Sequence, residues 1–232
     1  MSVIRFNPDE VFNTDSQEYD ILVNAALMIK GVPGGVVEIG TRRGGSARMI
    51  IDALAHNADT DRSMFCIDPY GNIELDVTNV NRTVHYGEQA LLDGDPMSKE
   101  IVTQKKFDYT NAMRNRIIPS LYYYAYNAGL NFNFFCLEDT EFFKRYTDGV
   151  PVYEEQKKLL NEYAFVFFDG PHTDEAVFTE MAFFEIRAPK GAVWVFDDIW
   201  MYSHDEKVEP WLFKRGWETL EKRNIKASYV KK

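Results

Sequence analysis

The stretch that decides the fold is Val36-Val37-Glu38-Ile39-Gly40-Thr41-Arg42-Arg43-Gly44-Gly45-Ser46. It begins as a short apolar run rich in β-branched residues, which favours a buried strand, and it becomes polar and glycine-rich from Gly40 onward. The apolar residues that come next are spaced as one helix face over 47–54. The stretch therefore predicts a strand, a tight turn and a helix, with the helix N-terminus placed to face a ligand.

The same alternation of strand and helix continues along the chain. Continuous apolar runs predict further strands at 64–67, 132–136, 165–168 and 192–196, and helical spacing predicts helices at 15–30, 138–146 and 174–187. Continuous rather than alternating hydrophobicity means that both faces of each strand are covered, which is typical of a parallel sheet. We predict an α/β fold with a doubly wound, mostly parallel, Rossmann-like sheet of about six to seven strands and helices on both faces.

One domain is expected, covering residues 1–232, because this length is common for a single α/β domain. Residues 69–131 interrupt the alternation, since they form a longer connection than one crossover helix requires. This insertion has a polar first half and a helical second half with several tyrosines. A lid, a dimer surface and an additional packed helix are all consistent with it.

Composition limits the partners. The chain carries 26 basic and 36 acidic residues, for a net charge of −10, and so acidic a protein repels nucleic acid unless its basic residues are clustered. Its apolar runs are too short to cross a bilayer, so we expect a cytoplasmic protein that binds neither nucleic acid nor membrane. Cys66 and Cys136 are expected to be buried, reduced thiols. The basic residues near the C-terminus, Lys226 among them, are expected to form a mainly solvated surface.

Three carboxylates are placed to bind a cofactor, because each lies near the end of a predicted strand. Glu38 precedes the glycine turn, where Arg42 occupies the middle glycine position of the dinucleotide fingerprint and so disfavours a pyrophosphate. Asp68 could accept hydrogen bonds from both hydroxyls of a ribose, or it could cap a turn at Pro69. Asp139 could receive an adenine amino group or cap the following helix.

A second acidic group follows two later strands. Asp169 ends the strand at 165–168, and Asp197 and Asp198 end the strand at 192–196. If these strands are neighbours, the three carboxylates meet at one edge of the sheet, where a hard cation such as Mg²⁺ would relieve their repulsion. Solvated loop acids are the alternative. His172 follows Asp169 by three residues and could serve as a base beside the cation or only as a hydrogen-bonding residue.

Five segments taken together resemble the class I S-adenosylmethionine-dependent methyltransferases. They are VVEIGTRRGGS, CIDPYG, CLEDTEFF, FFDGPHTDEAVFTEM and GAVWVFDDIW. Within that superfamily they are most similar to the branch that contains macrocin O-methyltransferase and cephalosporin hydroxylase-like proteins. The resemblance covers about residues 36–200 and rests on the order of the five motifs at strand ends.

The resemblance implies a role for each matching position. The turn would hold the aminoacyl part of S-adenosylmethionine through Glu38, Gly40 and Gly44. Thr41 and Ser46 are also expected to belong to this cofactor-binding site. Asp68 would bind the ribose and Asp139 the adenine. Asp169, Asp197 and Asp198 match the metal ligands of metal-dependent members, and His172 falls where related catechol methyltransferases have a basic lysine.

The chain also departs from the pattern of these families. Pro171 stands in Asp169-Gly170-Pro171-His172, where relatives carry a second aspartate. After Trp200 only a helix at 208–222 and one strand at 225–230 are expected, which would leave the closing antiparallel hairpin incomplete.

The function predicted from these features is O-methyl transfer from S-adenosylmethionine to a small hydroxylated molecule or sugar, assisted by a divalent cation and with His172 as base. A homodimer is an additional expectation. Two alternatives stay open. A nicotinamide-dependent oxidoreductase or epimerase would need a pyrophosphate fingerprint and a Tyr-x-x-x-Lys pair, and a non-catalytic protein could have kept only the cofactor pocket.

Overall fold

The computed structural model describes residues 7–14, 16–70, 74–76, 106–108, 111–153 and 156–232. Its main feature is a seven-stranded sheet in the order β10-β11-β9-β8-β1-β2-β5. Strands β5, β2, β1, β8 and β9 are mutually parallel, and β11 runs antiparallel to both of its neighbours, β9 and β10. This arrangement confirms the predicted doubly wound, mostly parallel sheet.

The five parallel strands closely match the apolar runs in the sequence. They are β1 (Gly35–Ile39), β2 (Ser63–Ile67), β5 (Asn131–Phe135), β8 (Tyr163–Phe168) and β9 (Val193–Phe196). Every residue of β1, β2, β8 and β9 is buried, as expected for strands that are covered on both faces. The outer strand β5 is less buried because it forms an edge of the sheet.

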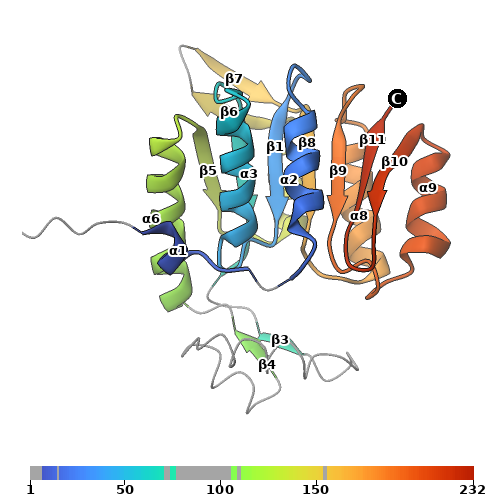
Figure 1. Cartoon of the computed structure of the whole chain (residues 1–232), viewed down its shortest axis with the longest axis horizontal. Coiled ribbons are helices and arrows are strands. Elements are labelled where there is room, and N and C mark those ends of the chain that lie inside the picture. The colour runs from blue at the N-terminus through green and yellow to red at the C-terminus, as the bar shows by residue number, and fades with distance from the viewer. Residues whose placement is uncertain (1–6, 15, 71–73, 77–105, 109–110, 154–155) are drawn as a thin grey trace, which may run out of the picture.

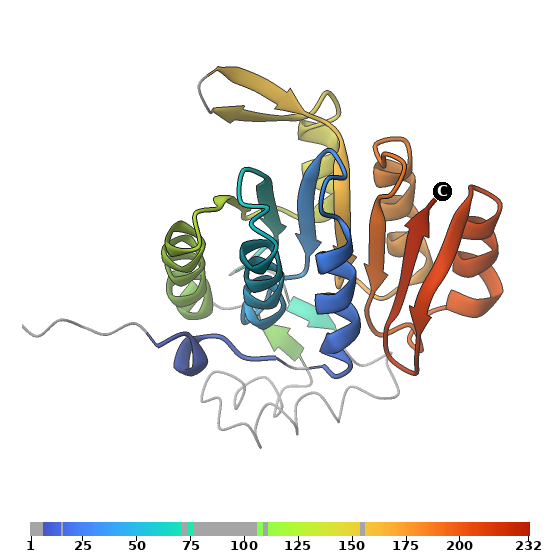
Figure 2. The same cartoon turned by 45° about the horizontal axis from the view of Figure 1, so that its top comes forward.

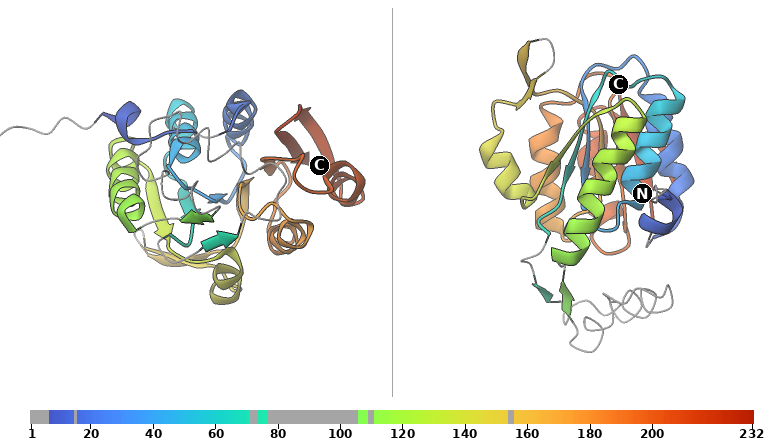
Figure 3. Two further views of the ribbon diagram at one scale, coloured as in Figure 1. Left: turned by 90° about the horizontal axis from the view of Figure 1, so that it is seen from below. Right: turned by 90° about the vertical axis from the view of Figure 1, so that its left-hand side faces the viewer.

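Helices cover both faces of the sheet (Figures 1 and 3). On one face lie α2 (Tyr19–Met28), α3 (Gly45–His56) and α6 (Asn111–Asn127), and on the other lie α7 (Asp139–Arg145) and α8 (Asp174–Glu185). Two apolar clusters, one on each side of the sheet, form the core. The carboxyl ends of the parallel strands therefore open at one edge of this three-layer sandwich.

The C-terminal part of the chain differs from the prediction. A π-helical turn η1 (His204–Val208) and a short helix α9 (Glu209–Phe213) are followed by two strands, β10 (Trp217–Lys222) and β11 (Ala227–Lys231). The expected helix at 208–222 is wrong beyond α9, because Gly216 adopts a φ of 81° and turns the chain into β10. The antiparallel hairpin is complete, and β11 pairs with β9.

The start of α2 also differs from the predicted helix range of 15–30. The helix begins at Tyr19, and its N-cap Glu18 has a left-handed backbone with φ 59° and makes no side-chain cap. The Glu18 carboxylate instead accepts hydrogen bonds from the backbone N–H groups of Ile225 and Lys226, both at 3.0 Å. The N-terminal segment is thereby attached to the turn between β10 and β11.

The remaining elements are short. Helix α1 (Pro8–Val11) lies at the N-terminal end, β6 (Val150–Tyr153) and β7 (Lys157–Leu160) form a hairpin at the opposite end of the sheet from the strands' carboxyl ends (Figure 2), and β3 (Glu74–Asp76) pairs with β4 (Lys106–Asp108). Within the insertion at 69–131, α6 packs beside β5 and confirms the helical second half. Its expected role as a lid or dimer surface falls largely on residues outside the described ones.

The two cysteines differ in their exposure to solvent. Cys66 is buried, but Cys136 is exposed, so the prediction of two buried thiols is wrong for Cys136, which follows the edge strand β5. None of the helices that the structure describes is long and apolar enough to cross a membrane.

Candidate functional site

The predicted site residues come together at the carboxyl ends of β1, β2, β8 and β9. Gly40 follows β1 with a φ of 83°, and a Cβ at this position would lie 1.8 Å from the carbonyl oxygen of Asp169, which follows β8. The turns after β1 and β8 therefore approach as closely as a glycine allows. Gly40 and Asp169 both line the cavity at this edge of the sheet.

Asp68 holds the glycine turn in place. Its Oδ2 accepts hydrogen bonds from the backbone N–H groups of Thr41 (2.9 Å) and Arg42 (2.8 Å), and its Oδ1 accepts one from the N–H of Tyr70 at 3.2 Å. A carboxylate has about four acceptor positions, so three hydrogen bonds leave capacity for one more. Burial raises the pKa of Asp68 to about 7, although the three N–H groups oppose the shift.

Glu38 lies within the sheet beneath the turn. Its side chain is fully buried, and the Cys66 thiol donates a hydrogen bond to its Oε2 at 3.2 Å. Burial raises the pKa of Glu38 to about 7, and hydrogen bonding by Ser46 and Cys66 lowers it in part. Glu38 is therefore a buried residue that lies next to the turn. Thr41 and Gly44 lie in the turn itself, and Ser46 lies at the start of α3.

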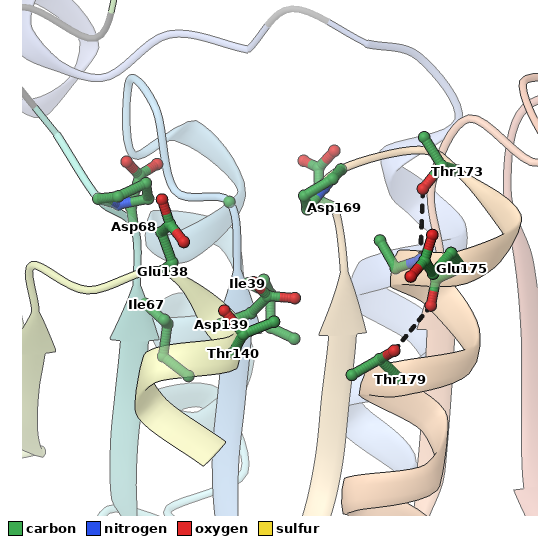
Figure 4. Close-up of a pocket in the computed structure, with 15 residues that line it drawn as sticks. Ile39, Ile67, Asp68, Glu138, Asp139, Thr140, Asp169, Thr173, Glu175 and Thr179 are labelled. Atoms are coloured by element: carbon green, nitrogen blue, oxygen red, sulfur yellow. Dashed lines mark hydrogen bonds between the residues drawn. The ribbon is translucent and has the colours of Figure 1, made fainter. Parts of the chain in front are cut away.

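A cavity of about 430 Å³ lies above these strand ends, and Gly40, Asp68, Asp139 and Asp169 all line it. In Figure 4, Asp68 and Glu138 lie on one side of the cavity and Asp169, Thr173 and Glu175 on the other. Asp139 is the first residue of α7, whose N-cap Glu138 makes no side-chain cap. Asp139 lines the cavity and is not the N-cap residue of α7, so the alternative expectation of a helix cap is wrong.

The strands β8 and β9 are neighbours, with Phe168 opposite Phe196, so the acidic residues that follow them do meet. His172 lies between two of them: its Nε2 is 3.6 Å from Oδ1 of Asp169 and 3.7 Å from Oδ2 of Asp198. Asp198 has a left-handed backbone with φ 44° and accepts a hydrogen bond from the indole N–H of Trp200 at 3.1 Å. A strained residue of this kind is typical of functional sites.

Asp197 is engaged differently. Its Oδ1 accepts hydrogen bonds from the Lys226 ammonium at 2.7 Å, the Ser16 hydroxyl at 3.0 Å and the backbone N–H of Asp198 at 2.8 Å. Its Oδ2 is closed off from solvent and has no hydrogen-bond partner among the described residues. Burial raises the pKa of Asp197, and the ammonium of Lys226 opposes that shift.

The three carboxylates do not fit a divalent cation that all of them share. One oxygen of Asp197 already accepts hydrogen bonds from three donors, and one of these donors is the positively charged ammonium of Lys226. In the part of the chain that the structure describes, no group of three or more His, Cys, Asp or Glu side chains is arranged to hold a metal ion. We therefore assign no chemical step to a cation.

Sequence analysis missed two residues of the site. Lys226 was expected on a solvated surface but is fully buried, so that prediction is wrong for this residue. Glu180 of α8 is also buried, with both carboxylate oxygens lacking a hydrogen-bond partner among the described residues, and a Cβ on Gly170 would lie 2.7 Å from its Oε1. Burial and the nearby charge of Asp139 raise the pKa of Glu180. A lysine directly before a strand and an acid within an apolar helix were the available signals.

A second, larger cavity of about 1070 Å³ adjoins the first. Both are bordered by Thr173, and the second is also bordered by His172, Trp200, Tyr202 and Arg223. His172 therefore lies where the two cavities meet. The arrangement offers one smaller compartment at the strand ends and a second, more open compartment that aromatic and charged residues border.

Comparison with solved structures shows the same fold in known methyltransferases. The O-methyltransferase NovP matches with a TM-score of 0.54 and 16% identity, covering 91% of this chain and 79% of its own. The calicheamicin methyltransferase CalS11 matches with a TM-score of 0.55 and 13% identity over 91% of this chain and 76% of its own. TomG of Streptomyces achromogenes is an O-methyltransferase involved in tomaymycin synthesis, and its structure was solved with S-adenosylmethionine. It matches with a TM-score of 0.51 and 12% identity, covering 92% of this chain and 79% of its own.

Comparison of sequences identifies the family. Among curated proteins none matches the chain significantly. A family profile described as "Methyltransferase domain" matches residues 37–199, which is more than half of the chain and contains every candidate site residue from Glu38 to Asp198. The chain therefore belongs to the methyltransferase domain family.

Proposed function

We propose that this protein transfers a methyl group from S-adenosylmethionine to a hydroxyl oxygen of a small molecule or sugar. The observation that carries the proposal is the cavity at the carboxyl ends of β1, β2 and β8, where Gly40 and Asp68 lie together. Ligands of open α/β sheets bind at this edge. Asp68 has one acceptor position left for a ribose hydroxyl, and Asp139 faces the same cavity from α7, where it could accept from an adenine amino group.

The second cavity supports a polar acceptor. It is open to solvent at an edge where His172, Trp200 and Tyr202 meet charged residues such as Arg223. Aromatic rings beside charged groups suit a molecule that has both apolar faces and hydroxyls. Two of the similar structures are a calicheamicin methyltransferase and an O-methyltransferase involved in tomaymycin synthesis. For this chain we propose a hydroxylated small molecule or sugar as the acceptor.

The chemistry assigns a role to each group near His172. When bound, S-adenosylmethionine supplies an electrophilic methyl group. His172 Nε2 takes the proton from the acceptor hydroxyl, and the carboxylates of Asp169 and Asp198 stabilise the resulting imidazolium. Bound S-adenosylmethionine would lose its methyl group to the acceptor oxygen, and the electron pair of the broken sulfur–methyl bond would stay on sulfur. Binding the two reactants in neighbouring cavities would supply the proximity on which such a transfer depends.

The partners and location expected from sequence belong to this proposal. They are a small-molecule or sugar acceptor, a homodimer, a cytoplasmic location, and no nucleic acid or membrane. The acidic net charge of −10 supports the absence of nucleic acid.

Binding and turnover test the proposal. Isothermal titration with S-adenosylhomocysteine, S-adenosylmethionine and NAD should show binding of the two sulfur compounds only. Transfer of a labelled methyl group should then be detected with a panel of hydroxylated aromatics, nucleotide sugars and glycosides. Binding of NAD without either sulfur compound would contradict the cofactor assignment, and transfer to amines but not to hydroxyls would contradict the acceptor class.

Asp68→Asn is expected to weaken S-adenosylhomocysteine binding by about 1–3 kcal/mol, the scale of hydrogen bonds to a charged group. The carboxylate is the accepting form, and its pKa is about 7. Wild-type affinity should therefore fall as the pH drops through 7, by up to about tenfold per pH unit. In the Asp68→Asn protein, the affinity should depend less on pH, because Asp68 no longer titrates. Glu38, whose pKa is also about 7, still titrates in both proteins.

Calorimetry between pH 6 and 8 measures this difference. Asp61→Asn is the matched control, because Asp61 is an exposed acid just before β2, and it should bind as the wild type does. If the Asp68→Asn protein keeps both the affinity and the pH slope of the wild type, Asp68 does not contact the cofactor.

A further inference from the structure

The most unusual group near the site is the ammonium of Lys226. The side chain is fully buried, and its Nζ lies 2.7 Å from Oδ1 of Asp197, which is 1% exposed. The Ser16 hydroxyl accepts a second hydrogen bond from Nζ at 2.8 Å, and the ring of Tyr19 lies 4.3 Å from it. A buried charge needs such partners, because an unpaired ammonium is costly away from water.

The fold fixes Lys226 opposite Asp197. Ala227 pairs with Phe196 in the antiparallel β11–β9 ladder. Lys226 precedes Ala227 and Asp197 follows Phe196, so these two residues also lie opposite each other. The Glu18 carboxylate accepts from the backbone N–H of Lys226, which holds the start of β11 against the N-terminal segment. The ammonium is therefore held by the sheet register and by a second segment of the chain.

Asp197 is one of three carboxylates at this edge of the sheet. Asp169 and Asp198 lie on either side of His172, whereas Asp197 is turned toward Lys226. A dication on the same carboxylate would lie close to a fixed positive charge and would be repelled by it. Lys226 thus provides at Asp197 the positive charge that a divalent cation would otherwise provide.

We propose that Lys226 is a built-in replacement for a divalent cation at Asp197, so that Asp197 serves as a positioning residue and not as a metal ligand. Through its hydrogen bond from the backbone N–H of Asp198 at 2.8 Å, the Asp197 carboxylate fixes the left-handed turn that directs Asp198 toward His172. The inference rests on the proposed function only in placing these acids beside the acceptor.

Binding of Mn²⁺ alone to the full chain tests this proposal without using activity. The protein is stripped with a chelator and dialysed, and free Mn²⁺ is followed by electron paramagnetic resonance. Asp197→Asn should leave the Mn²⁺ affinity unchanged, because this carboxylate does not bind the ion while Lys226 is present. Lys226→Met should bind Mn²⁺ at least tenfold more tightly, and adding Asp197→Asn to that variant should remove the gain.

Lys231→Met is the matched control, because Lys231 is the last residue of β11, the strand that Lys226 directly precedes, and forms a partly exposed ion pair with Glu185. It should bind Mn²⁺ as the wild type does. A loss of tenfold or more in Mn²⁺ affinity in the Asp197→Asn protein would overturn the proposal, as would a folded Lys226→Met protein with no gain. If Lys226→Met does not fold, the comparison of Asp197→Asn with the wild type decides alone.

Titration of the same samples with S-adenosylhomocysteine separates the two proposals. If S-adenosylhomocysteine fails to bind to the wild type, the proposed function is wrong, whereas the Mn²⁺ measurements still decide the role of Lys226.

Discussion

Replacing His172 with alanine is expected to lower the rate of methyl transfer by about 10²- to 10⁴-fold, the usual range for the loss of a general base. The expectation follows from the position of the imidazole, whose Nε2 lies 3.6 Å from Asp169 and 3.7 Å from Asp198 at the junction of the two cavities. Affinity for S-adenosylhomocysteine should not change, because His172 does not line the smaller cavity. Single-turnover rates and calorimetry on the same samples measure the two effects separately.

The pH–rate profile distinguishes a base from a structural residue. If His172 had only a structural role, His172→Ala would leave the shape of the profile unchanged. At saturating S-adenosylmethionine, where the loss of affinity through Asp68 does not affect the rate, the wild type should lose activity on the acidic side as the base becomes protonated, and the alanine variant should lose that limb. His56→Ala is the matched control, since His56 is exposed near the end of α3, and its profile should be that of the wild type. An unchanged acidic limb in the His172→Ala protein would remove His172 as the base.

Gly40→Ala is expected to abolish cofactor binding and to destabilise the fold. The new Cβ would lie 1.8 Å from the carbonyl oxygen of Asp169, so the turns after β1 and β8 would have to separate. Overpacking costs roughly 1–3 kcal/mol, and a left-handed backbone with φ 83° costs an alanine roughly 1–2 kcal/mol more. Urea denaturation measures the loss of stability, and titration with S-adenosylhomocysteine measures the loss of binding.

Gly216→Ala separates the two contributions. Gly216 has a nearly identical φ of 81°, but a Cβ there would meet no atom within 4 Å. Its loss of stability should therefore reflect the backbone alone, and cofactor binding should be kept. If Gly40→Ala is no less stable than Gly216→Ala and still binds S-adenosylhomocysteine, the close contact between the two turns is not required for the site.

Parts of the fold that depend on local pattern were predictable. The buried strands β1, β2, β8 and β9 appear as continuous apolar runs, and α7 and α8 lie within the predicted ranges. The C-terminal hairpin was missed because β10 carries mainly polar residues, whose pattern does not distinguish a strand from a helix face. Its identity as a strand comes from pairing with β11, a contact that exists only after folding.

Part of the candidate site could also be predicted from sequence, and part of it could not. That Gly40, Asp68, Asp139 and Asp169 would face one cavity could be predicted from sequence, because each follows a parallel strand and all such strands end at one edge. The sequence placed Asp197 and Asp198 together, but it could not distinguish the one beside His172 from the one beside Lys226.

By itself, the sequence determined which residues form the parallel strands and which acidic residues follow them, because hydrophobic periodicity and chain order are local properties. Only the tertiary structure decided which of those acids are paired. Asp68 binds the N–H groups of a turn 26 and 27 residues away, and Lys226 binds Asp197 from 29 residues away and Ser16 from 210. Contacts at such separations depend on sheet order and strand register, which the packing of the whole core sets.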